Sequence, residues 1–100
     1  LGQIATILQQ HYPMQRVAIE AHTDHGSTSV RNTQWRSHHQ LTAAQAMAVF
    51  EQLTSRNINP HRLFVMGHGG NHPIASDGTA EGQAMNRRIE IVVYPETYGR

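Results

Sequence analysis

Apolar residues recur along this 100-residue chain with two spacings, one typical of helices and one typical of strands. Near the start they follow helical spacing, at Leu1, Ile4, Ala5 and Leu8. This pattern predicts a helix that ends soon after His11, because Pro13 cannot continue it. The length fits one domain, residues 1–100. Because the first helix opens without a capping residue, we expect this domain to be a fragment of a longer protein.

Three short segments have the apolar pattern of strands. Residues 17–21 and 89–94 alternate between apolar and other side chains, and residues 63–66 form a short apolar run. Pro95 is predicted to end the last strand. Residues 79–85 fit a short helix just before that strand.

The longest helix is predicted between the first two strands. Thr42 and Gln45 have the spacing of a capping box, in which each side chain bonds the backbone N–H of the other residue. The helix would then begin at Thr42, with backbone donors and a partial positive charge there, and end near Arg56. Its broad apolar face contains Leu41, Ala44, Met47, Ala48, Val49, Phe50 and Leu53.

This order of elements predicts a two-layer α/β (α+β) sandwich. A strand, a crossover helix and a second strand form a right-handed parallel pair. The helices would then cover one face of a small sheet. The connection over residues 22–40 exceeds the usual length, and such loops are generally functional or disordered.

Composition excludes several classes of protein. The chain has eight Arg, eight His, no Lys and no Cys, and its net charge is +1 with His neutral. Without Cys there is no disulfide framework, iron–sulfur cluster or thiol nucleophile. No apolar run reaches the ~18 residues of a membrane span. The balanced charge argues against nucleic-acid binding, and no serine elbow or carboxylate pair indicates an enzyme.

Polar residues gather where loops meet the predicted strands, at residues 22–25, 68–72 and 86–88. Such loops usually form the ligand site of an open α/β sheet. Asp24 suits an ammonium group, while the start of the long helix and an arginine, Arg87 or Arg88, suit a carboxylate. This combination favours a zwitterionic, amino-acid-like ligand. The alternative is that Asp24 pairs internally with one of these arginines and holds the loops together.

Histidines in the same loops suggest a second kind of site. His22, His25, His68 and His72, with Asp24, offer nitrogen and oxygen ligands for zinc. They include no helical His-x-x-x-His pair, however, and loop histidines are common without a metal. We therefore assign no metal and no cofactor, and keep a histidine-based metal or pH-responsive site as an alternative hypothesis.

Three motifs support a more specific interpretation: IEAHTD at residues 19–24, LTAAQA at 41–46 and GQAMNRRIEI at 82–91, with Gly67 and Pro73 between the last two. In this order they resemble the OmpA-like C-terminal domain, the peptidoglycan-binding module shared by OmpA, the Pal lipoprotein and the flagellar stator protein MotB. The resemblance covers residues 1–94, and NRRIEI is its most specific part.

The resemblance implies a βαβαβ-type fold with the helices on one small mixed sheet, no catalysis, and binding of the diaminopimelate-containing stem peptide of peptidoglycan. By position, Thr23 and Asp24 match the ligand-binding turn, with the aspartate facing the ligand amine. Asn86 and Arg87 match the segment that lines the same pocket. It also implies that this domain is a C-terminal fragment of a longer, membrane-tethered protein. That protein would have a periplasmic, cell-envelope location, with its membrane anchor outside this chain.

Two positions depart from the family pattern Asn-x-x-Leu-Ser-x-x-Arg-Ala. His38 replaces the asparagine, and Gln45 replaces the arginine that holds the ligand carboxylate. Gln45 keeps hydrogen-bonding groups without the charge, so ligand binding should be weaker or altered. The capping box gives Gln45 a structural role instead. The alternative function is a ligand-deficient structural or homodimerising module. The loop length and Trp35 favour a MotB-like member over Pal.

Overall fold

The computed structural model describes residues 1–25 and 35–97. Its helices are α1 (Gly2–His11), α2 (His38–Thr54) and α3 (Ala80–Asn86), and its strands are β1 (Gln15–His22), β2 (Leu63–Gly67) and β3 (Arg88–Thr97). A short 3₁₀ helix, Pro60–Arg62, leads into β2. The order β1-α2-β2-α3-β3 confirms the expected βαβαβ arrangement. The middle of the predicted long loop, residues 26–34, lies outside the described residues.

The strands form one mixed sheet in the order β2-β1-β3. The central strand β1 runs parallel to β2, with Ile19 opposite Val65. It runs antiparallel to β3, with Ile19 opposite Ile91. The parallel pair joined by α2 is the crossover unit that the sequence predicts.

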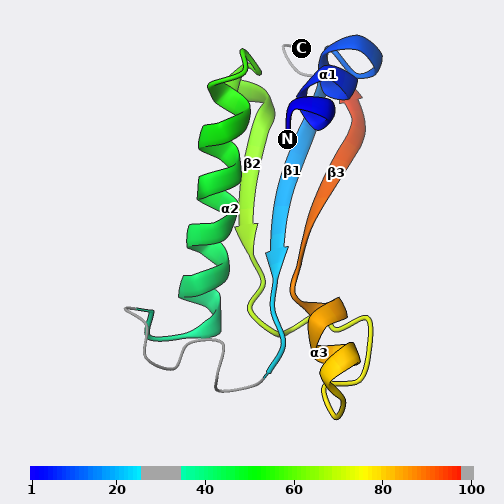
Figure 1. The fold of residues 1–100 in the computed structure, drawn as a ribbon. Helices are drawn as coiled ribbons and strands as arrows, with labels where there is room; N and C mark the ends of the chain where they lie inside the picture. The colour runs from blue at the N-terminus through cyan, green and yellow to red at the C-terminus, as the bar shows by residue number, and fades with distance from the viewer. Residues whose placement is uncertain (26–34, 98–100) are drawn as a thin grey trace.

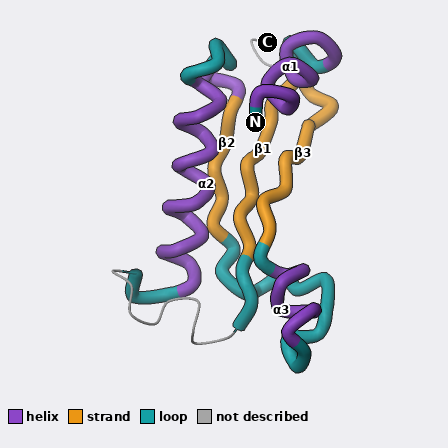
Figure 2. Tube along the Cα trace, viewed as in Figure 1, coloured by secondary structure: helices purple, strands orange, loops and turns teal. Residues whose placement is uncertain are grey.

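The long helix α2 lies along one face of the sheet, over β2 and β1 (Figures 1 and 2). At one end of the sheet, α1 lies beside the end of β3, and α3 lies at the opposite end, beyond the ends of β1 and β2 (Figure 1). The core fills the space between the sheet and the helices with apolar side chains: Ala5, Leu8, Val17, Ile19, Ala21, Ala46, Leu53, Ile58 and Leu63. This arrangement confirms the expected two-layer fold.

The prediction that Pro95 ends the last strand is wrong, because β3 continues to Thr97. β3 is an edge strand, where a missing backbone N–H breaks no ladder on the open side. The pairing with β1 also shifts its register between Gln15 and Val17. Proline is therefore tolerated at this position.

The predicted capping box at Thr42 and Gln45 is also wrong, because α2 begins at His38. The N-cap is Ser37, whose Oγ accepts a hydrogen bond from the backbone N–H of Gln40 at 3.0 Å. In return, Oε1 of Gln40 accepts from the N–H of Arg36 at 2.6 Å. Ser37 and Gln40 have the same spacing as the predicted pair, so the pattern by itself did not distinguish the two starts.

Inside the helix, the Thr42 side chain connects α2 to the turn after β2 by a hydrogen bond. Its hydroxyl donates to the carbonyl oxygen of His38 at 2.9 Å and accepts the backbone N–H of Gly69 at 3.0 Å. Gly69 has a φ of +60°, which glycine adopts without strain. At Gly67, a Cβ would lie only 2.4 Å from the backbone nitrogen of Ala43. Glycine at this position therefore permits the close approach of helix and strand.

Replacing Thr42 with valine should destabilise the domain by about 1–3 kcal/mol, because it leaves the buried N–H of Gly69 without an acceptor. Thr42→Ser keeps the hydroxyl and should cost less than the valine variant. Urea denaturation of both variants would give the two free energies of unfolding. Equal stability of the valine and wild-type proteins would contradict the anchoring role of the hydroxyl.

Candidate functional site

The candidate site lies where β1 and β2 end and β3 begins. Backbone pairing continues there beyond the two parallel strands: the N–H of Thr23 donates to the carbonyl oxygen of Gly69 at 2.9 Å, and that of His68 donates to Ala21 at 3.0 Å. Thr23 and Asp24 are 4% and 2% exposed. The turn after β1 is therefore a fixed and buried part of the structure.

Asp24 forms an ion pair with Arg87, the residue that follows α3. Nη1 of Arg87 donates to Oδ2 of Asp24 at 2.5 Å. The carboxylate is buried, whereas the Arg87 side chain is 51% exposed. A guanidinium has five N–H donors, so the exposed part of Arg87 can bind a further anion while Asp24 holds it in place. The internal pairing that the sequence left as an alternative is therefore present.

Asn86, just before Arg87, fixes the loop between β2 and α3. Its Oδ1 accepts the backbone N–H groups of Ile74 at 2.8 Å and Ala75 at 3.1 Å. Its Nδ2 donates to the carbonyl oxygen of Ala75 at 3.0 Å and to Oδ1 of Asp77 at 2.7 Å. These bonds use both acceptor and both donor positions of the amide. Asn86 therefore positions the neighbouring arginine and has no hydrogen-bonding group left for a ligand.

A cavity of about 530 Å³ opens between α2 and the start of β3. Thr23, Gln45 and Arg87 contribute polar groups to its wall. A mostly apolar wall with a few polar groups is typical of small-ligand pockets. The remaining lining residues are His22, Leu41, Ala48, Val49, Arg88 and Ile89.

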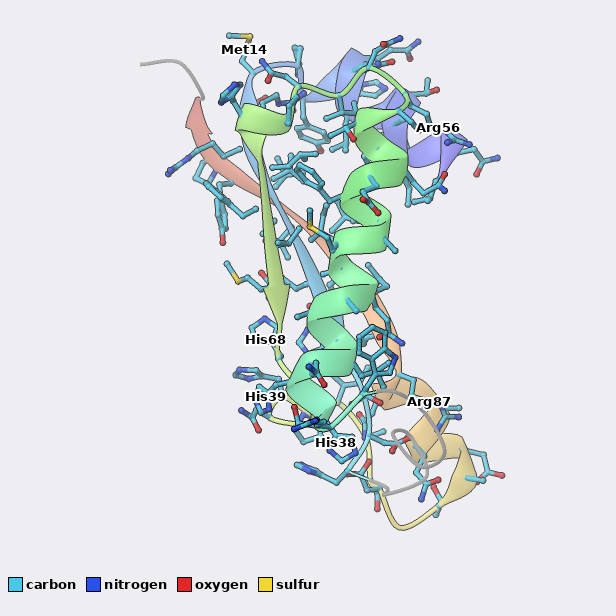
Figure 3. The ribbon with its side chains drawn as sticks, turned by 90° about the vertical axis from the view of Figure 1, so that its left-hand side faces the viewer. Met14, His38, His39, Arg56, His68 and Arg87 are labelled. Atoms are coloured by element: carbon cyan, nitrogen blue, oxygen red, sulfur yellow. The ribbon has the colours of Figure 1, made fainter. Side chains whose placement is uncertain are left out.

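The six sequence-predicted site residues thus occupy different positions. Thr23, Gln45 and Arg87 line the cavity, and Asp24 is tied to it through Arg87. Figure 3 shows His38 at the start of α2 and Arg87 at the same end of the molecule, beyond the helix. Neither His38 nor Asn86 is among the lining residues.

The expected role of a helix N-terminus at Thr42 is not fulfilled. Because α2 starts at His38, Thr42 and Gln45 lie inside the helix. Their backbone N–H groups therefore bond within the helix and are not free for a ligand. The side chain of Gln45 is exposed, and it makes no hydrogen bond within the described part of the chain. The Gln45 amide is therefore the group that α2 offers to the cavity.

Ionisable groups beside the cavity are perturbed by burial and by Arg88. Burial lowers the pKa of His22 below its usual range, and the positive charge of Arg88 lowers it further. A hydrogen bond from Nε of Arg88 to Oε2 of Glu90, 2.5 Å long, lowers the pKa of Glu90. At neutral pH the His22 imidazole is therefore uncharged and Glu90 is anionic.

The model of the OmpA family matches residues 1–87 of the chain. The chain belongs to the OmpA family.

Several OmpA-family proteins are similar over most of this chain. The probable lipoprotein YiaD of Escherichia coli (strain K12) is 35% identical over 95% of this chain and 40% of its own length. The peptidoglycan-binding protein ArfA of Mycobacterium tuberculosis (strain ATCC 25618 / H37Rv) is 37% identical over 81% of this chain and 23% of its own length. The chain therefore spans less than half the length of these curated relatives.

The fold also matches a solved structure of an OmpA-family relative. The C-terminal domain of Helicobacter pylori MotB superposes with a TM-score of 0.86 at 28% identity, over 96% of this chain and 71% of that one. The family assignment agrees with the expected non-catalytic, envelope-type domain. None of the helices in the described ranges is long and apolar enough to cross a bilayer.

The apolar wall of the cavity is the part of the candidate site that the sequence analysis missed. Leu41, Ala48 and Val49 appeared only as part of the core-facing side of the helix, and Ile89 as a strand residue. A signal was present, because residues 41, 45, 48 and 49 share one helical face, on which Gln45 is the polar member. The apolar stripe was assigned to core packing alone, whereas part of it lines the cavity.

The contribution of the Asp24–Arg87 ion pair can be measured with a double-mutant cycle. Asp24→Asn, Arg87→Gln and the double variant should give a coupling free energy of about 1 kcal/mol, since one partner is buried and the other is screened by solvent. Chemical denaturation supplies the three changes in the free energy of unfolding. Additive single effects would show that the two side chains do not interact in solution.

Proposed function

We propose that this OmpA-family domain binds the peptide stem of peptidoglycan, with diaminopimelate in the cavity between α2 and β3. The observation that carries this proposal is the Asp24–Arg87 pair beside that cavity. The pair places a fixed negative and a fixed positive group next to one another. The free end of a diaminopimelate side chain is an amino acid and carries the same two charges.

Each polar group of the site has a counterpart on such a ligand. The half-exposed guanidinium of Arg87 suits the ligand carboxylate, because arginine binds carboxylates with paired N–H donors. Asp24 is buried and does not line the cavity, so its carboxylate acts on the ligand ammonium through its charge rather than by direct contact. Thr23 and Gln45 add neutral hydrogen-bonding groups, and the apolar wall suits the methylene chain between the two ends.

The relatives support the same function. ArfA is described as a peptidoglycan-binding protein, and the matched part of MotB is a C-terminal domain of a motility protein. We infer that this domain works in the periplasm, where it anchors a larger envelope or flagellar-motor protein to the cell wall. The membrane attachment would be supplied by a segment outside this chain.

Gln45 is expected to weaken this interaction relative to the family pattern. An arginine at this position would add a second cation for the ligand carboxylate, whereas glutamine provides a neutral donor. Hydrogen bonds to charged groups contribute ~1.5–3 kcal/mol, against ~0.5–1.5 for neutral ones. Among the described residues, Arg87 and Arg88 are the cations that line the cavity, and Arg87 is the one that pairs with Asp24.

A titration with a diaminopimelate-containing stem tripeptide tests the proposal. Calorimetry or NMR should detect saturable binding at millimolar ligand or below. Gln45→Arg should tighten binding by about tenfold, and Arg87→Gln should weaken it by about the same factor. A stem peptide with lysine at the third position lacks the second carboxylate and should bind more weakly.

Gln52→Arg is the matched control for the added charge. It lies on the exposed side of the same helix, away from the cavity lining, and should leave the affinity unchanged. If neither the wild-type protein nor the Gln45→Arg variant binds while both remain folded, the proposal fails. Self-association across a concentration series in sedimentation would then favour the ligand-deficient, homodimerising module.

A further inference from the structure

A polar cluster lies on the face of the sheet opposite the core. Val17, Ile19 and Ala21 of β1 point into the core, so the alternate residues Glu20 and His22 point away from it. At the end of this face, His68 follows β2. Figure 3 shows His68 on one side of α2 and Arg87 on the other. The polar cluster therefore does not include the Asp24–Arg87 pair, although its member His22 also borders the cavity.

The contacts within this cluster are close. Nε2 of His68 lies 2.8 Å from Oε1 of Glu20. The rings of His22 and His68 stack with their centroids 4.6 Å apart and their planes within 6°. The ring of His72 stands edge-on beside them, 4.9 Å from His68. Three imidazoles and one carboxylate thus meet within one small region.

His22 is the feature of this cluster that most requires an explanation. It is 4% exposed, and neither of its ring nitrogens has a hydrogen-bond partner within the described residues. A buried polar group without a partner costs about 1–3 kcal/mol. Few such groups occur in native proteins, and an unseen ion is one of the recurrent reasons for them. An imidazole that stays neutral offers a nitrogen lone pair to a metal.

The surrounding charges favour a cation. Glu20 contacts His68, and Glu90 accepts a hydrogen bond from Nε of Arg88. Arg88 is further held by the carbonyl oxygens of Asn86 and His72. Counted without the imidazoles, these two carboxylates and one guanidinium carry a net negative charge beside His22 and His68.

We propose that Glu20, His22 and His68 form a binding site for a divalent transition-metal ion, with zinc as the best match. One ligand atom from each residue lies within 4.8 Å of the other two. Around a tetrahedral zinc ion with ligand distances of about 2.0–2.1 Å, neighbouring ligand atoms are about 3.3 Å apart. Because the two rings stack with nearly parallel planes, metal binding requires one ring to turn out of the stack, so that both nitrogen lone pairs point at the ion.

The ligand set decides between classes of cation. Two imidazole nitrogens and one carboxylate oxygen are typical zinc ligands, with the fourth position left to water. Magnesium and calcium prefer oxygen ligands and should bind this set poorly. The sequence grouped His25 with His22 and His68, but the ring of His25 lies against Gly70, and Glu20 takes its place in the cluster.

Calorimetric titration of untagged, chelator-treated protein with zinc chloride tests the site. We expect one zinc ion per chain, bound with micromolar or tighter affinity. Glu20→Gln and His68→Gln should each weaken binding by at least about tenfold, because even residues that only support metal ligands contribute 10–100-fold. His22→Phe keeps the buried ring and should abolish saturable binding. Cobalt substituted for zinc should give visible absorption bands that the His68→Gln variant lacks.

His25→Gln is the matched control, because it removes a nearby histidine outside the proposed ligand set. It should bind zinc as the wild-type protein does. The proposal is overturned if zinc does not saturate the wild-type protein at 100 µM (roughly tenfold or more above the expected dissociation constant), or if His25→Gln weakens binding as much as His68→Gln. Circular dichroism confirms the fold of each variant. If His22→Phe does not fold, Glu20→Gln and His68→Gln decide the outcome.

Discussion

The close contact between the first turns of α2 and the turn after β2 determines where the site residues lie. Gly67 lets the helix backbone come within reach of the strand end, and the Thr42 hydroxyl then binds the N–H of Gly69. Because this turn also pairs with Thr23, one network fixes the helix and both parallel strand ends. The side chains of Leu41 and Gln45 therefore stand at a defined distance from β3, where they form one wall of the cavity.

Oppositely charged side chains form pairs both beside the cavity and on the face of the sheet opposite the core. On the cavity side, buried Asp24 orients the half-exposed Arg87, so the cation is in place before a ligand arrives. Such preorganisation lowers the conformational cost of binding. On the opposite face of the sheet the exposure is reversed, because Glu90 is the more exposed partner of Arg88, and Glu20 contacts His68. In both places a carboxylate holds an arginine or a histidine side chain in position.

The alternation of side chains along β1 explains why two different environments arise from one strand. Residues 17, 19 and 21 pack under the helices and make the core. Residues 20 and 22 face the other side, where no helix of the described chain supplies an apolar cover (Figure 1). Polar side chains can therefore gather there without reducing the apolar contacts of the core, and His22 is buried among its own neighbours.

The amino-acid sequence by itself determined the order of the elements, the three strands and the family, because side-chain periodicity and the NRRIEI segment are local properties. It also identified Thr23, Gln45 and Arg87 as candidate site residues, and the structure places these three around one cavity.

Tertiary structure decided where α2 begins, how far β3 extends and which residues join the polar cluster. Ser37 with Gln40 and Thr42 with Gln45 have the same capping spacing. Ser37 is the N-cap of α2, because the Thr42 hydroxyl instead accepts the backbone N–H of Gly69. Pro95 stays in β3 because that strand lies at the edge of the sheet. Glu20 joins His22 and His68 only through strand pairing, since contacts between residues distant in the chain depend on register and packing rather than on local sequence.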